Sequence, residues 1–230
     1  MNPEGSTQPT VDSTGPAAAS TRPATHDYRV LQTRTQFSGR VFDVVTDTVA
    51  MPGGGSADRD YVRHVGAVGV VALDDGGRVV MVRQYRHPVR QALWELPAGL
   101  IDVPGEDPLP AAQRELAEEA DLAADRWDLL VDLHTTPGCS DESIRVYLAR
   151  GLRPAPESGH VPSDEEAELT VSWFDLDDAA EMALRGEVTN GPAVAGVLAA
   201  VRAQARDWSG LRSASAPRPG RTARPGASPE

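Results

Sequence analysis

The segment Ala98–Leu122, AGLIDVPGEDPLPAAQRELAEEADL, combines an apolar repeat with a dense run of charges. It predicts a helix from about Pro108 to Leu122, because Asp107 suits the N-cap and proline suits the first helical turn. Positions three and four apart share one face of a helix. A stripe that would pack against a sheet is formed by Leu109, Ala112, Leu116 and Ala120.

Three glutamates, Glu115, Glu118 and Glu119, lie together beside this stripe. Like charges at these spacings repel each other, and the negative end of the helix dipole adds to the cost. No basic residue four positions from Glu115 or Glu119 offsets the repulsion. A solvated acidic surface is one interpretation. The other is a site for a divalent cation, for which Mg²⁺ is the natural hard ion.

The same segment resembles the Nudix box, in which a glycine, five residues, a glutamate and seven residues precede Arg-Glu-apolar-x-Glu-Glu-x-Gly-apolar. Gly99 is here followed by six residues before Glu106, and the spacing from Glu106 to Arg114 and the later glutamates is regular. Asp121 replaces the second glycine of the motif. A loop tolerates one extra residue, and aspartate tolerates the left-handed conformation expected at a helix end, so we expect an intact catalytic helix.

Two further stretches, VRQYRHPVRQALWELPAGLID at 82–102 and TTPGCSDESIRVYLA at 135–149, resemble ADP-ribose pyrophosphatases of the actinobacterial type. The resemblance covers about residues 28–205 and includes the lengthened loop before Glu106. It implies an α/β (α+β) fold, a Nudix α/β/α sandwich with a mixed central sheet, preceded by a small N-terminal β extension. It also implies a homodimer with exchanged N-terminal extensions.

The chain divides into four predicted parts. Residues 1–26 and 211–230 are rich in small residues and proline without periodicity, and are predicted to be disordered tails. Residues 27–62 are expected to form the β extension that serves dimerisation, and residues 63–210 the Nudix hydrolase domain. Residues 60–73 are predicted as one strand that forms a hairpin with the next strand along the chain.

The resemblance implies a role for each residue of the box. The backbone carbonyl of Ala98 and the carboxylates of Glu115 and Glu119 would bind the metal ion, with Glu118 as a further or shared ligand. Arg114 would hold the glutamates through ion pairs. The cofactor would be Mg²⁺, with Mn²⁺ as the alternative ion.

Substrate contacts are implied outside the helix. Arg86 resembles a residue that contacts phosphate or ribose, and Glu95 one that contacts the terminal ribose or adenine. Arg59 resembles one that reaches the substrate of a partner subunit. Arg86 and Arg59 could instead be ordinary surface charges, and Trp94 a core residue rather than a stacking platform. Glu106 would be structural or would support the metal ligands.

A carboxylate that already binds metal is a poor base, so the group that accepts the proton from water is expected elsewhere. Glu142, in the loop PGCSDES, is our first candidate, with Glu118 and Arg114 completing the catalytic group. Alternatively, Glu142 is an ordinary exposed acidic residue of a turn, without a catalytic role. The rival base is Glu165 or Glu168, in the acidic segment SDEEAE.

The implied reaction is the Mg²⁺-dependent hydrolysis of ADP-ribose to AMP and ribose 5-phosphate. The alternative is a Nudix pyrophosphatase for another nucleoside diphosphate derivative, such as a sugar nucleotide. The remote alternative is a non-catalytic Nudix module that senses a nucleotide. Such a module would be expected to lack the helical glutamates or to carry a DNA-binding domain.

Composition disfavours several other classes of function. The 34 acidic and 22 basic residues give a net charge of −12, which argues against nucleic acid and anionic membranes as partners. No apolar run is long enough to span a membrane, and the N-terminal stretch lacks the features of a secretory signal. The single cysteine, Cys139, fits a reducing compartment. We therefore expect a cytoplasmic protein whose partner is a small-molecule nucleoside diphosphate substrate.

Overall fold

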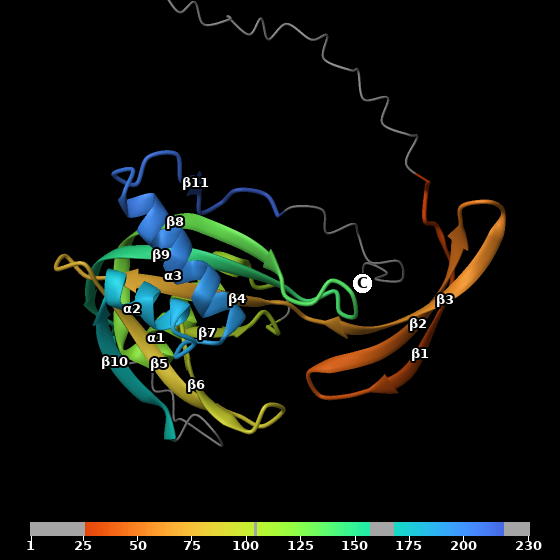
Figure 1. The fold of residues 1–230 in the computed structure, drawn as a ribbon, viewed down its shortest axis with the longest axis horizontal. Coiled ribbons are helices and arrows are strands. Elements are labelled where there is room, and N and C mark those ends of the chain that lie inside the picture. Colours follow the sequence, from red (N-terminus) through yellow and green to blue (C-terminus); the bar gives the residue numbers. More distant parts are fainter. Residues whose placement is uncertain (1–25, 104, 157–167, 219–230) are drawn as a thin grey trace, which may run out of the picture.

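A computed structural model describes residues 26–103, 105–156 and 168–218 of the chain. Within these ranges a three-stranded sheet lies beside a larger body of sheet and helices (Figure 1). The elements in chain order are β1 (Val30–Ser38), β2 (Phe42–Met51), β3 (Gly55–His64), β4 (Ala67–Leu73), β5 (Arg78–Arg86), β6 (Gln91–Glu95), β7 (Ala98–Leu100), α1 (Pro108–Ala120), β8 (Leu122–His134), β9 (Ser143–Pro154), β10 (Thr170–Asp175), α2 (Leu176–Leu184), α3 (Gly191–Gln204) and β11 (Arg212–Ser213).

The larger body is built on a mixed sheet with the strand order β10-β5-β4-β9-β8-β11. β4 runs parallel to β9 and antiparallel to β5 and β7, while β6 pairs with β5. All seven residues of β4 are buried, because the strand AVGVVAL is apolar on both faces and lies in the middle of the sheet. The hairpin of β4 and β5 confirms the pairing expected from the turn signal between them.

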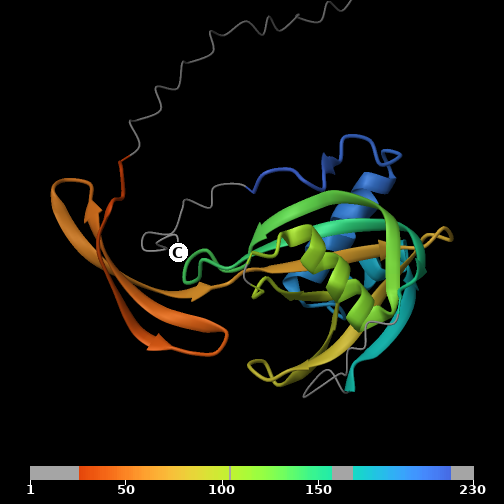
Figure 2. The ribbon, with the colours of Figure 1, turned by 180° about the vertical axis from the view of Figure 1, so that it is seen from behind.

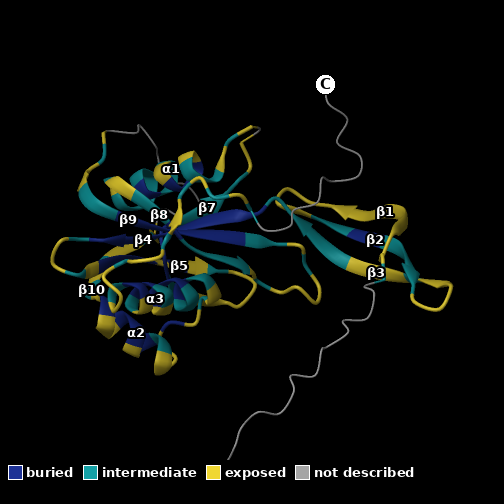
Figure 3. Ribbon diagram, turned by 90° about the horizontal axis from the view of Figure 1, so that it is seen from above, coloured by how far each residue is buried: buried dark blue, intermediate teal, exposed yellow. Residues whose placement is uncertain are grey.

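Helices cover both faces of this sheet, as the views from behind and from above show (Figure 2, Figure 3). On one face Leu116 of α1 packs in a cluster with Val70. On the other face Val197 of α3 packs in a cluster with Val71 and with residues of α2. Alternate residues of a strand point to opposite faces, so β4 contributes to both cores. The predicted α/β/α sandwich with a mixed sheet is confirmed. None of the described helices is both long and apolar enough to cross a membrane.

The N-terminal extension is an antiparallel sheet, with β2 in the middle, that projects from the larger body (Figure 3). The prediction that residues 60–73 form one strand is wrong. Strand β3 ends at His64, and a separate strand, β4, begins at Ala67. Gly66 lies at the break with a φ of 90°, a left-handed conformation that glycine adopts without steric cost. The β-like residues on both sides of Gly66 concealed this bend, at which the chain leaves one sheet and enters the other.

The folded body ends later than residue 210. β11 pairs with β8, and the guanidinium of Arg145 donates a hydrogen bond of 2.7 Å to the backbone carbonyl of Ala216. Arg145 is buried, and a buried charge needs hydrogen-bond acceptors. Residues 211–218 are therefore attached to the folded body and are not part of the disordered tail that was predicted from their composition. The predicted tails at 1–25 and 219–230 lie outside the described residues.

Candidate active site

Helix α1 is positioned by its apolar stripe, of which Leu116 is fully buried. Asp107 occupies the predicted N-cap position, although its side chain makes no capping hydrogen bond. The helix ends at Ala120, two residues before the predicted end, because Asp121 adopts a left-handed conformation with φ 55° and ψ 30°. The backbone N–H of Asp121 donates to the carbonyl of Ala117 at 3.2 Å. The expectation that aspartate serves in place of the motif's glycine is confirmed.

Gly99 of β7 brings the strand backbone into close contact with Glu115. A Cβ atom at position 99 would overlap the carboxylate of Glu115, so only glycine allows this approach. The side chain of Glu115 is 12% exposed and is therefore largely enclosed between strand and helix. The first glycine of the motif thus sets the position of a helical carboxylate.

Glu119 lies against the same strand, one helical turn after Glu115. Its carboxylate accepts a hydrogen bond of 2.9 Å from the backbone N–H of Ala98. The structure therefore brings together Ala98, Glu115 and Glu119, which the sequence assigned to metal binding.

Arg114 joins three carboxylates through hydrogen bonds and ion pairs. Its Nη1 donates to Glu115 at 2.6 Å and to Glu118 at 3.1 Å, while Nε and Nη2 donate to Glu106 at 3.4 and 3.2 Å. These bonds, first those with Glu106 and then the interactions with Glu115, raise the pKa of the Arg114 guanidinium above its ordinary value. The extra loop residue before Glu106 has therefore not removed Glu106 from the network.

The donor atoms suit a hard divalent ion, although no three acidic, histidine or cysteine side chains in the described residues meet as a ready-made metal site. Glu115 and Glu118 instead share Arg114, and Glu119 bonds to the backbone of Ala98. Carboxylate oxygens with a backbone carbonyl and water are ordinary ligands of Mg²⁺. Ala98 and the three glutamates are thus the groups that would hold such an ion.

The structure pairs two of the expected substrate residues with each other. Arg86 donates two hydrogen bonds to the carboxylate of Glu95, at 2.9 and 2.7 Å, and Glu95 is buried whereas Arg86 remains 43% exposed. Trp94 packs against the core and stacks edge-on with Phe174 at 5.1 Å, which agrees with its interpretation as a core residue. Glu95 therefore orients the Arg86 guanidinium.

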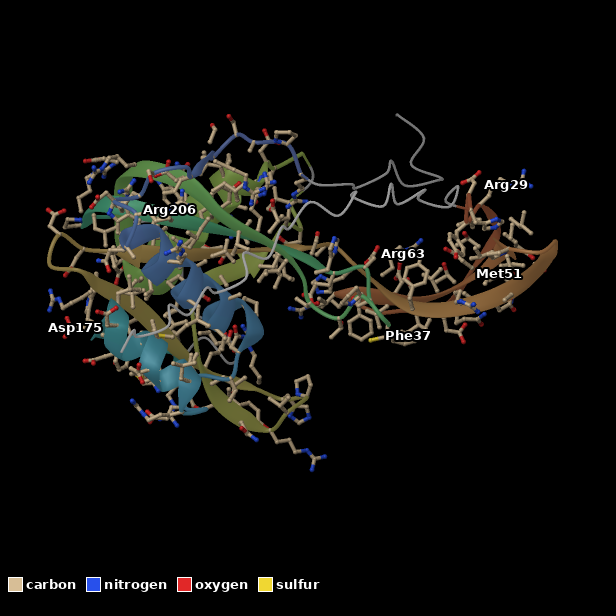
Figure 4. All side chains as sticks on the ribbon, turned by 45° about the horizontal axis from the view of Figure 1, so that its top comes forward. Arg29, Phe37, Met51, Arg63, Asp175 and Arg206 are labelled. Atoms are coloured by element: carbon tan, nitrogen blue, oxygen red, sulfur yellow. The ribbon has the colours of Figure 1, made fainter. Side chains whose placement is uncertain are left out.

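Arg59 lies in the N-terminal sheet and not beside the helical glutamates of its own chain. Its guanidinium donates to the backbone carbonyl of Asp58 at 2.9 Å and contacts the sulfur of Met51. Figure 4 marks Met51 far out on this sheet, away from the helices. Any contact of Arg59 with substrate would consequently need a second subunit.

Glu142 lies in a loop that is attached to the end of β3. Its carboxylate accepts a hydrogen bond of 2.6 Å from the hydroxyl of Thr135. In the sheet, Val146 of β9 is level with Gly69, which in turn is opposite Ala98. Glu142 precedes Val146 by four residues, which corresponds to about 13 Å along a strand. Glu142 is therefore displaced along the direction of β9 from the level of Ala98.

The sequence did not reveal which groups hold this loop. The backbone N–H of His64 donates to Asp141 at 2.7 Å, and the His64 ring lies 3.6 Å from the Glu142 carboxylate. The ring Nδ1 also accepts a hydrogen bond of 3.1 Å from the backbone N–H of Gly66, so the ring is tied to the bend between β3 and β4. No sequence signal links these residues, because 77 positions separate His64 from Asp141.

The fold and the helix together define an α/β/α hydrolase with a Nudix box. A model of the NUDIX domain matches residues 63–195, and the chain belongs to this family of hydrolases. It is 52% identical over 178 residues to the ADP-ribose pyrophosphatase of Mycobacterium tuberculosis, an alignment that spans 76% of this chain and 84% of the relative.

Two further proteins are similar to the chain. The ADP-ribose pyrophosphatase of Bacillus subtilis is 37% identical over 152 residues, which are 66% of this chain and 80% of the relative. A crystal structure of an ADP compounds hydrolase has a TM-score of 0.66 at 22% sequence identity, and the match covers 82% of this chain and 99% of that chain. The likeness to this solved structure supports the fold.

Proposed function

We propose that this Nudix hydrolase cleaves the diphosphate bond of ADP-ribose to give AMP and ribose 5-phosphate, with Mg²⁺, or alternatively Mn²⁺, bound at α1. The observation that carries the proposal is the convergence of Glu115 and Glu119 at the backbone of β7, with Arg114 paired to Glu115. The relative that is 52% identical is named for this reaction. We place the enzyme in the cytoplasm, because a single cysteine suits a reducing compartment.

Hydrolysis of a diphosphate requires an oriented water, neutralised phosphoryl oxygens and an acceptor for a proton. A divalent ion, when bound, neutralises charge and makes the water more acidic. Arg114 keeps the carboxylates of Glu115 and Glu118 in place, and Glu95 holds the guanidinium of Arg86 ready for a phosphate or ribose. The water oxygen bonds to phosphorus as the bridging P–O bond breaks, and its proton passes to a carboxylate base.

A panel of nucleoside diphosphate derivatives, incubated with the full-length protein and Mg²⁺, tests this function. We expect ADP-ribose to have the highest kcat/KM, with AMP and ribose 5-phosphate identified by chromatography. No AMP from ADP-ribose would refute the proposal, and a higher kcat/KM for a sugar nucleotide would select the alternative substrate. If the protein binds a compound but cleaves none of the panel, it is a sensing module. The presence of all three helical glutamates argues against that outcome.

Glu119→Gln is expected to raise the Mg²⁺ concentration for half-maximal activity by about tenfold or more, since it removes one charge from the ligand set. The amide oxygen can still accept the hydrogen bond from Ala98, so the fold should persist. A titration of activity with Mg²⁺ measures the effect. The matched control is Glu181→Gln, on the exposed side of α2, and an equal metal dependence in both variants would contradict the ligand role of Glu119.

We propose Glu142 as the base, which requires its loop to move towards the helix when substrate binds. Glu142→Gln should lower kcat by about 10²-fold or more while leaving the metal requirement unchanged. Glu168→Gln is the comparison, because Glu168 is exposed just before β10, whereas its rival Glu165 lies outside the described residues. Near-normal turnover of Glu142→Gln with a slow Glu168→Gln variant would assign the base to the later segment.

We also propose a homodimer with exchanged N-terminal extensions, in which Arg59 reaches the partner's substrate. β1 is exposed along its whole length. The side chain of Tyr28, just before β1, is 59% exposed, and that of Phe37, within β1, is 56% exposed. Apolar groups gathered at a surface are typical of an interface. Light scattering should therefore give twice the chain mass of 24.4 kDa, and the mass of a single chain would contradict the dimer.

A further inference from the structure

We propose that a cavity at the far end of β4 is a second ligand site, which binds a small phosphate monoester of a sugar. The cavity measures about 280 Å³ and lies where the β4–β5 turn meets β8, β9 and the segment after α3. Arg206, marked in Figure 4, lies on that segment, two residues before the lining residue Trp208. This site is not part of the reaction proposed above.

Two arginines that line the cavity carry hydrogen-bond donors without a partner in the described part of the chain. The Nε of Arg150 is buried and has no hydrogen-bond partner in the described part of the chain. Its Nη2 pairs with Asp128 at 2.8 Å, and its guanidinium lies over the ring of Trp208 at 4.9 Å, so its orientation is held from two sides. The side chain of Arg126, which also lines the cavity, makes no hydrogen bond or ion pair with the described residues. The exposed Arg126 guanidinium, beside the positive charge of Arg150, fits an anion.

The wall that carries Trp208 is built with unfavourable backbone geometry. Asp207 and Trp208 have φ values of 50° and 60°. Aspartate tolerates this left-handed conformation near a helix end, but it is uncommon for a residue as bulky as tryptophan. The backbone N–H of Trp208 donates to Ala203 at 2.9 Å and returns the chain towards α3. Strain of this kind persists where the surrounding structure holds it, and it concentrates at ligand sites.

The charges and the volume select the class of ligand. Asp74 is already paired with Arg78 at 2.7 Å, but Asp75 and Gln204 leave a carboxylate and an amide at the cavity for hydroxyl groups. An anion alone would meet the negative Asp75, whereas a phosphate that carries hydroxyls uses both kinds of group. Drug-sized ligands occupy pockets of about 300–1,000 Å³. The volume of about 280 Å³ lies near the lower end of this range and therefore suits a small ligand such as a sugar phosphate.

The cavity is separate from the carboxylates of α1. Arg150 is opposite Leu73 of β4, whereas Ala98 is opposite Gly69 of the same strand. Four residues of a strand correspond to about 13 Å. A phosphate monoester at Arg150 therefore does not occupy the position between β7 and α1.

Titration calorimetry on the full-length protein, with a metal chelator present, tests the site. Ribose 5-phosphate and inorganic phosphate are the two probes, and we expect ribose 5-phosphate to bind more tightly. Arg126→Gln should weaken its binding at least about tenfold, because one charged hydrogen-bonding group is lost. The matched control is Arg153→Gln, which removes a neighbouring exposed arginine that pairs with Asp125. Its affinity should stay within about twofold of the parent protein.

Four results would overturn the proposal. The first is the absence of binding by either probe, and the second is an equal loss of affinity in Arg126→Gln and Arg153→Gln. The third is weaker binding in Glu119→Gln but not in Arg126→Gln, which would place the probe at the catalytic helix. Equal affinity for both probes would overturn the assignment to a sugar phosphate. Arg126 is exposed, so its replacement should leave the fold unchanged, which circular dichroism verifies.

Discussion

Gly99→Ala is expected to lower the activity by about 10²-fold or more while the domain stays folded. The added Cβ atom would overlap the carboxylate of Glu115, which must then leave its place beside β7. Gly99 has no left-handed φ, so the backbone itself accepts alanine. A displacement of about 1 Å in a catalytic group is enough to cost about 10²-fold in rate. The measurements are kcat with ADP-ribose and the thermal melting temperature.

Gly69→Ala provides a closely matched control for this variant. Gly69 lies on β4, opposite Ala98, and a Cβ atom there would meet its nearest neighbours at 3.8–3.9 Å, which is ordinary van der Waals contact. We expect near-normal activity from Gly69→Ala. Comparable activity of the two variants would show that the close approach of Gly99 and Glu115 is unimportant for catalysis. If the melting temperature falls in Gly99→Ala but not in Gly69→Ala, the loss of activity in Gly99→Ala is due to impaired folding.

Arg114→Ala is the second change with a large expected effect, because it leaves three neighbouring carboxylates without their shared cation. Removing one partner of a fully buried ion pair costs about 3–5 kcal/mol. The Arg114 side chain is 32% exposed, so water screens part of this loss and we expect about 2 kcal/mol. For a domain of this size that corresponds to a melting temperature lower by about 4–8 °C. Activity should fall by about 10²-fold, since Glu115 and Glu118 lose their orientation.

Arg114→Lys and Arg153→Ala separate the causes of this effect. Lysine keeps the charge but cannot bond to Glu106, Glu115 and Glu118 through a planar fork, so it should restore stability more than activity. Arg153→Ala breaks an exposed ion pair with Asp125 and should change the melting temperature by less than about 2 °C. Normal activity in Arg114→Ala would contradict its role as the holder of the carboxylates.

The chemistry of the helix was readable from the sequence because it is local. Helical spacing places Glu115, Glu118 and Glu119 on one side of α1 whatever surrounds it, and the motif depends on that spacing. The left-handed cap at Asp121 is also local, since it depends on the preference of one residue. The apolar run of β4 likewise predicted a strand paired with the next one, and the structure places this strand in the middle of the sheet.

Contacts between distant positions were not readable in the same way. The pairing of Arg86 with Glu95 depends on the geometry of β5 and β6, and the position of Glu142 depends on the register of β9. The attachment of residues 211–218 depends on the buried charge of Arg145, which composition does not reveal. Each of these features depends on which segments the sheet places side by side.

The sequence by itself therefore determined the order of the helical carboxylates, which follows from helical periodicity within a few turns of chain. The family and the α/β/α architecture followed from the resemblance of the motif and its flanking segments. Only the tertiary structure decided that Gly99 fits against Glu115, that Arg114 still reaches Glu106 across the lengthened loop, and that Arg126 and Arg150 share a cavity. Such contacts arise from packing between segments far apart in the chain, for which the local sequence contains no signal.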